Sequence, residues 1–195
     1  MAFTGLNFLK RKKKKSPKYS VMFVCAVNIQ RSPMAEAIFY HLVEQRSELN
    51  KWDIASSGVS SEATHQQPVS PCTITVLEDN HIKPRLHPSR KLCHDDFKHY
   101  RYILCMDEDN LRLAKEKLPH GCKAKVELLG NYDPKGERIV VDPIFDCNDW
   151  NAFDPNNPAI IINPRLGNLS DYEHVFQQCW RSCNTFLDFV TGQKA

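Results

Sequence analysis

The stretch Val24-Cys25-Ala26-Val27-Asn28-Ile29-Gln30-Arg31-Ser32 joins a predicted strand to a predicted helix and fixes the fold class of this chain. The apolar run 21–24 that leads into it is typical of a buried parallel strand. Ser32-Pro33 predicts a helix start, because serine suits the N-cap and proline the first helical position. The loop between them therefore has a cysteine at its first position and an arginine at its last.

Strands and helices alternate along the rest of the chain. Further strands are predicted at 52–58, 100–106 and 125–129, and helices after Ser32, over 107–118 and from Ser170 onward. Ser70-Pro71 repeats the helix-start signal, but the β-branched run 73–76 favours helix and strand equally. The alternation predicts an α/β fold, a three-layer Rossmann-like domain with a central four-stranded parallel sheet and the Cys25 loop after the first strand. Ligands of such folds bind at the carboxyl ends of the strands.

Charge and length divide the chain into a tail and a domain. The formal net charge is +3, yet residues 1–20 hold seven basic residues and no acidic one, which leaves −4 for the remainder. Residues 1–19 are therefore predicted to be a disordered basic tail, and 20–195 one domain. The tail is either a solvated arm or a segment that contacts anionic lipid, nucleic acid or import machinery.

Composition excludes several classes of protein. No apolar run reaches the length of a membrane span, no secretory signal follows the basic cluster, and Met-Ala excludes N-myristoylation. The eight cysteines lack paired CxxC spacing and zinc-ligand patterns, so we expect reduced thiols and no metal. The expected location is the cytoplasm, with the nucleus as the alternative.

The Cys25 loop has the chemistry to hold a tetrahedral oxyanion. Backbone N–H groups at a strand-to-helix turn form an anion nest, and the helix N-terminus adds positive potential. Arg31 supplies a planar fork that matches two phosphate oxygens. The same donors favour the thiolate form of Cys25, which can attack phosphorus and form a phosphocysteine. The loop therefore predicts transfer of a phosphoryl group to cysteine.

The leaving oxygen of such a reaction needs a proton. Asp142, which precedes Pro143 after the last strand, is the candidate general acid. Asp133-Pro134 and Asp154-Pro155 have the same local sequence and are rivals for that role.

Several separate motifs resemble the low-molecular-weight protein tyrosine phosphatases. They are residues 24–37, 102–107, 125–130, 142–143 and 172–179, in the order of that family. The resemblance implies that Cys25 is the nucleophile, Arg31 the phosphate-binding arginine and Asp142 the general acid, with no cofactor. It implies that Ser32 stabilises the thiolate, and that Ser57 and His87 support Asn28. It also implies that Ala26, Val27, Asn28, Ile29, Gln30 and Phe145 surround the substrate.

The departures from the family lie in and around the loop. Val27 stands where the family has glycine, and Gln30 where it has a second cysteine that can protect the nucleophile by a disulfide. The aromatic residue of the active-site wall is replaced near Ala63, and two tyrosines become Ile144 and Phe145. About twenty residues within 146–168 are extra, and we expect them to form a lid or docking segment.

The expected function is cysteine-dependent hydrolysis of protein phosphotyrosine and small aryl phosphates. A catalytically weak or inactive phosphate-binding protein is the alternative that Val27 and the altered wall favour. A thiol-dependent arsenate reductase would need a resolving cysteine near Cys25, and a nucleic-acid-binding protein would rest on the basic tail alone.

Overall fold

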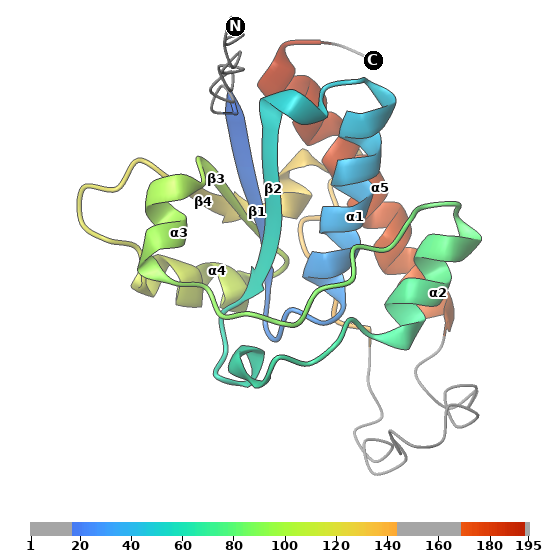
Figure 1. Ribbon diagram of the computed structural model, residues 1–195, viewed down its shortest axis with the longest axis horizontal. Helices are drawn as coiled ribbons and strands as arrows, with labels where there is room; N and C mark the ends of the chain where they lie inside the picture. Colours follow the sequence, from blue (N-terminus) through green and yellow to red (C-terminus); the bar gives the residue numbers. More distant parts are fainter. Residues whose placement is uncertain (1–16, 144–168, 194–195) are drawn as a thin grey trace, which may run out of the picture.

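The computed structural model describes residues 17–143 and 169–193 of the chain (Figure 1). Four parallel strands form one sheet in the order β2-β1-β3-β4. Their bounds are Tyr19–Cys25 for β1, Trp52–Gly58 for β2, Tyr102–Cys105 for β3 and Lys125–Leu128 for β4. This sheet confirms the predicted fold class, and it places Cys25 at the carboxyl end of a central strand.

Helices cover both faces of the sheet (Figure 1). One face carries α1 (Arg31–Gln45), α2 (Pro71–Asp79) and α5 (Leu169–Thr191), and the other carries α3 (His94–His99) and α4 (Glu108–Glu116). Short 3-10 turns lie at Leu49–Lys51, Glu62–His65 and Leu129–Tyr132. The loop between β1 and α1 therefore lies at the sheet edge where ligands of α/β folds bind.

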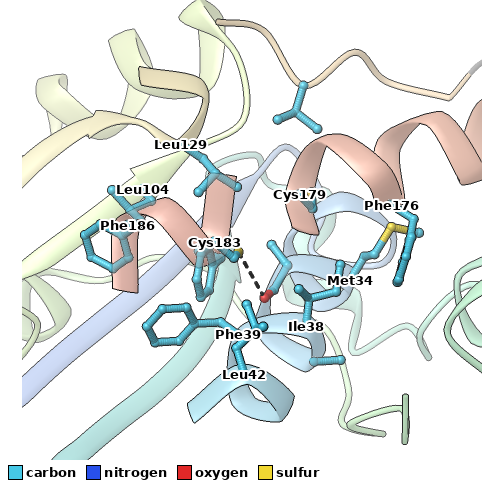
Figure 2. Close-up of a cluster of buried hydrophobic side chains, with 14 of the residues drawn as sticks. Met34, Ile38, Phe39, Leu42, Leu104, Leu129, Phe176, Cys179, Cys183 and Phe186 are labelled. Atoms are coloured by element: carbon cyan, nitrogen blue, oxygen red, sulfur yellow. Dashed lines mark hydrogen bonds between the residues drawn. The ribbon is translucent and has the colours of Figure 1, made fainter. Parts of the chain in front are cut away.

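Alternation along β1 divides the core into two clusters. Val21, Phe23 and Cys25 belong to the cluster beneath α1 and α5, whereas Met22 and Val24 belong to the cluster beneath α3 and α4. A strand buried on both faces explains the continuous apolar run in the sequence. Figure 2 shows the larger cluster, in which Phe176, Cys179, Cys183 and Phe186 of α5 pack with Met34, Ile38, Phe39 and Leu42 of α1.

The helices correct two predictions and decide one that the sequence left open. α1 begins at Arg31 with Gln30 at the N-cap position, so the prediction of Ser32 as N-cap was wrong. The Ser32 hydroxyl instead forms hydrogen bonds with Cys25 and Asn28. The ambiguous run 73–76 is helical within α2, with Ser70 at the N-cap position. α3 was not predicted, because six mostly polar residues show no apolar period.

Some predictions fall outside the described residues. These include Phe145 and the extra segment 146–168, as well as most of the basic tail, although Tyr19 at its predicted end belongs to β1. No helix within the described ranges has the length and apolarity to cross a membrane. The seven cysteines that the structure describes form no disulfide.

Candidate active site

Neighbouring segments hold the loop 25–30 through hydrogen bonds to its carbonyl groups. Four of them accept backbone hydrogen bonds of 2.7 to 3.0 Å: those of Cys25, Ala26, Ile29 and Gln30, from the amides of Val59, Ser60, Ser70 and Met34, respectively. These carbonyls are thus taken up by segments around the loop and by the first turn of α1, while the Asn28 N–H is directed to Cys25 Sγ. Successive N–H groups of such a strand-to-helix turn are able to bind an anion. The backbone is thus arranged as a nest at the N-terminus of α1.

Asn28, not Val27, carries the unusual backbone conformation of this loop. Its φ is 69°, in the left-handed region that asparagine tolerates better than most residues. Val27 is absent from the positive-φ positions in the described part of the chain. Valine at position 27 therefore fits the loop without the strain that a glycine-only conformation would impose.

Cys25 lies at the floor of the loop and is only 4% exposed. Its Sγ is 3.0 Å from Ser32 Oγ and accepts a hydrogen bond of 3.2 Å from the Asn28 amide. The sulfur is therefore held between a backbone N–H and a hydroxyl at the start of α1. The structure thus brings together the predicted nucleophile, Ser32 and the loop backbone.

The Asn28 side chain links the loop to its surroundings. Its Nδ2 donates to Ser32 Oγ at 3.0 Å and to Ser56 Oγ at 2.9 Å, and its Oδ1 accepts from the Arg90 amide at 3.0 Å. Ser57, predicted to support Asn28, instead directs its hydroxyl to Met22 Sδ, and its carbonyl accepts from Ser32. The side chain that does contact Asn28 is its neighbour Ser56, because alternate strand residues point to opposite faces.

His87 reaches this network through a buried carboxylate. Its Nε2 is 2.9 Å from Glu36 Oε2, and Ser56 donates to the same oxygen at 2.6 Å. The hydrogen bond to Glu36 raises the pKa of His87 above its ordinary value, although burial opposes the shift. Burial would raise the pKa of Glu36, but the bonds from His87, Ser56 and Arg85 outweigh it and lower that pKa. The two groups therefore form an ion pair behind the loop.

The Arg31 guanidinium is buried and held by two carboxylates. Nη1 donates to Asp107 Oδ2 at 2.6 Å and to the Val140 carbonyl at 3.0 Å, and Nη2 donates to Asp142 Oδ2 at 2.5 Å. Burial lowers the pKa of Arg31, but Cys25, Asp142 and Asp107 outweigh it and raise that pKa. Arg31 and the candidate acid Asp142 thus contact each other directly.

Asp142 has the environment of a proton donor. Its side chain is 52% exposed, so a substrate can reach it. Desolvation is the largest influence and raises the pKa of Asp142, which Arg31 opposes and Asp107 reinforces. The rival Asp133 has a buried carboxylate that binds Arg181. Burial would raise the pKa of Asp133, but the hydrogen bonds from Arg181 and the Lys135 amide outweigh it and lower that pKa. Asp133 is therefore a structural residue, and Asp154 lies outside the described residues.

Gly58 and Ala63 form the wall beside the loop. A Cβ on Gly58 would lie 2.6 Å from the Ala26 carbonyl oxygen and 2.7 Å from Ala63 Cβ, so only glycine fits at the end of β2. Ala63 is buried against this glycine. Position 63 therefore packs on the scaffold and presents no aromatic face to a substrate.

Gln30 adds a contact that the sequence did not predict. Its Nε2 donates to the hydroxyl of Tyr172 on α5. Neither Gln30 nor Cys25 is bonded to a cysteine within the described ranges. Across those ranges no group of three or more histidine, cysteine or acidic side chains is placed to hold a metal ion.

Comparison with known proteins gives one consistent family. The family model for low molecular weight phosphotyrosine protein phosphatase matches residues 20–194. A curated protein of that description from Sus scrofa is 39% identical over 173 residues, covering 88% of this chain and 95% of its own. Among solved structures, a protein tyrosine phosphatase from Entamoeba histolytica has a TM-score of 0.72 at 21% identity, covering 90% of this chain and 99% of its own. A drosophila arginine phosphatase has a TM-score of 0.69 at 27% identity, covering 89% and 99%.

Proposed function

The chain belongs to the low molecular weight phosphotyrosine protein phosphatase family, and we propose that it hydrolyses aryl phosphate monoesters through a phosphocysteine. Family membership makes it a phosphotyrosine protein phosphatase; the chemical route and the role of each residue are the proposal. The observation that carries it is Cys25 Sγ at the floor of a loop whose carbonyls are tied outward. A binding protein would not need a buried sulfur that accepts from the Asn28 amide and lies 3.0 Å from the Ser32 hydroxyl.

In the first step the Cys25 thiolate attacks phosphorus in line with the ester oxygen. The S–P bond forms as the P–O bond to the aryl group breaks, and Asp142 gives its proton to the leaving oxygen. Arg31 and the loop amides stabilise the three equatorial oxygens. In the second step water attacks phosphorus, its proton passes to the Asp142 carboxylate, and the S–P bond breaks to release phosphate and the thiolate.

Substrate binding has to change the partners of Arg31. In the free protein, its two Nη atoms are engaged by Asp107 and Asp142. A phosphate dianion in the loop accepts from the same fork and takes the place of the Asp142 carboxylate. Two effects then raise the pKa of Asp142 further: its carboxylate loses the ion pair with Arg31, and the bound phosphate places negative charge beside it. Binding therefore favours the protonated acid that the first step consumes.

The decisive experiment compares the wild-type protein with Cys25→Ser and Asp142→Asn on p-nitrophenyl phosphate. We expect Cys25→Ser to abolish turnover and Asp142→Asn to reduce it by ~10²-fold or more. Rapid quenching of the wild type should trap phosphate on Cys25. Equal rates for wild type and Cys25→Ser would contradict the route, and phosphopeptide binding without turnover would establish the binding protein instead.

The pH profile tests the acid independently. Because Asp142 has to be protonated and its pKa is raised above the ordinary value, kcat/KM should fall as the pH rises through that pKa. The enzyme would then work best on the acid side of neutrality. Asp142→Asn should remove this limb of the profile, and an unchanged profile would assign the proton to another group.

A panel of substrates tests the predicted class. Phosphotyrosine peptides should be hydrolysed in preference to phosphoserine peptides, because only the longer aryl ester reaches a buried Cys25. Phosphoarginine belongs in the panel because one similar structure is an arginine phosphatase. A preference for phosphoarginine would contradict the predicted substrate class but not the proposed cysteine chemistry.

A further inference from the structure

Helix α5 sends two buried polar side chains toward different halves of the active site. They are Tyr172 and Gln178, which are 1% and 0% exposed. Six residues, or about 9 Å of helix, separate them. Neither side chain contacts Cys25, Arg31 or Asp142 by a hydrogen bond in the described part of the structure.

Tyr172 holds the second half of the phosphate loop. Its hydroxyl accepts from Gln30 Nε2 and is also hydrogen-bonded to the side chain of Ser70. The Ser70 amide in turn donates to the Ile29 carbonyl at 2.7 Å. Burial raises the pKa of Tyr172 to about 12, so the phenol keeps its proton at working pH. The hydroxyl thus secures the two loop residues that precede Arg31.

Gln178 holds the segment that carries the general acid. Its Nε2 donates to the carbonyls of Glu137 and Ile139 at 2.7 and 2.9 Å. The next residue, Val140, donates to the Met106 carbonyl and accepts from Arg31. Asp142 lies two residues beyond this anchored point. The position of its carboxylate therefore depends on the backbone that Gln178 fixes.

We propose that Tyr172 and Gln178 are positioning residues, Tyr172 for the phosphate loop and Gln178 for Asp142. One rigid helix then sets the distance between the bound phosphoryl group and its proton donor. Displacement of a reacting group by about 1 Å is enough to cost ~10²-fold in rate. This inference rests on the proposed function, because it assigns the two residues to its two parts.

The two positions predict different kinetic signatures. Tyr172→Phe should raise KM and the inhibition constant of inorganic phosphate by about five- to tenfold, equally for p-nitrophenyl and phenyl phosphate. Gln178→Met keeps the volume but removes the donor. It should lower kcat/KM about tenfold more for phenyl phosphate than for p-nitrophenyl phosphate, because the poorer leaving group depends more on the acid.

Two matched variants control for general loss of packing. Tyr132→Phe removes another phenol that contacts α5, through Phe186, and that bonds Glu127 away from the loop. Ser182→Ala removes a fully buried hydroxyl of α5 that has no recorded partner in the described ranges. Both should leave phosphate inhibition and the ratio of the two substrates unchanged, whatever they do to the melting temperature.

The outcomes separate this inference from the proposed function. A wild type that does not hydrolyse aryl phosphate overturns the proposed function. An active wild type whose Tyr172→Phe and Gln178→Met variants show the signatures of the controls overturns the inference alone. Gln30→Met combined with Tyr172→Phe should be no worse than Tyr172→Phe alone, because the phenol change already removes the Gln30 contact. Multiplied effects of the two changes would contradict the link between them. If Gln178→Met fails to fold, Gln178→Asn, which keeps the amide but shortens its reach, should show the same substrate ratio.

Discussion

Asn28 supplies the left-handed backbone conformation of the loop 25–30, and its side chain forms hydrogen bonds with Ser32, Ser56 and Arg90. Val27→Gly should therefore change kcat/KM by less than about threefold, because position 27 needs no glycine conformation. Asn28→Ala should reduce kcat/KM by at least ~10-fold, and Asn28→Gly, which tolerates the φ, should recover only part of the loss. Steady-state kinetics on p-nitrophenyl phosphate measures all three. A large gain from Val27→Gly would show that valine distorts the loop.

Gly58 leaves room for the loop 25–30 because it has no Cβ. Gly58→Ala would force a Cβ to within 2.9 Å of the Val27 carbonyl carbon as well as against Ala26. We expect at least ~10-fold loss of kcat/KM together with destabilisation by about 2 kcal/mol. Gly121→Ala is the control, because its φ of 76° costs stability while nothing lies near the new methyl group. Loss of activity in proportion to stability in both variants would contradict a specific effect on the loop.

At the residue scale, sequence reasoning found the groups that local spacing defines. The separation of Cys25 from Arg31 and the strand before them suffices to place both in one loop. Ser56, Glu36 and Tyr172 were missed because their roles arise from contacts across 20 to 142 positions of sequence. A buried glutamate in an apolar helix stripe, as at position 36, is the signal that could have indicated the network.

Among the elements, the predicted strands were confirmed because a buried parallel strand leaves a distinctive apolar run. The sequence could not decide α2, because β-branched propensity competes with the Ser70-Pro71 start. Packing against α1 and α5 decides it. α3 is less than two turns long. Contacts such as the Asp96 ion pair with Arg90 fix it, and no periodicity reveals them.

The Glu36–His87 pair joins α1 to the segment between α2 and α3, and it should make stability depend on pH. The raised folded pKa of His87 contributes stability that is complete below its unfolded pKa of about 6.5 and is lost as the pH rises through the folded value. The lowered pKa of Glu36 contributes stability that is present above its unfolded value and is lost as the pH falls through the folded one.

His87→Gln should therefore destabilise the protein by about 1 kcal/mol near pH 6, and by less as the pH rises through the folded pKa of His87. Urea unfolding between pH 6 and 9 measures this difference. His99→Gln, at a more exposed pair with Asp53, is the matched control and should change little. A difference for His87→Gln that grows with pH would contradict the assigned charge states.

At the scale of the whole molecule, the sequence predicts that the basic tail acts independently of the domain 20–195. Deletion of residues 1–16 removes six of the seven basic residues before position 20. We expect unchanged hydrolysis of p-nitrophenyl phosphate, and loss of binding to vesicles rich in phosphatidylserine. Steady-state kinetics and vesicle sedimentation at two salt concentrations check both. Retained binding after the deletion would place the anionic contact on the domain. The cytoplasmic and nuclear locations stay predictions.

Packing of α1 against α5 has a consequence for how the protein is made. The ribosome releases residues 25–31 early, but the helix that covers α1 begins only at Leu169. During translation the nascent chain must keep the apolar face of α1 uncovered until α5 emerges. We therefore expect activity only after residues 169–191 have been synthesised and α5 has packed against α1.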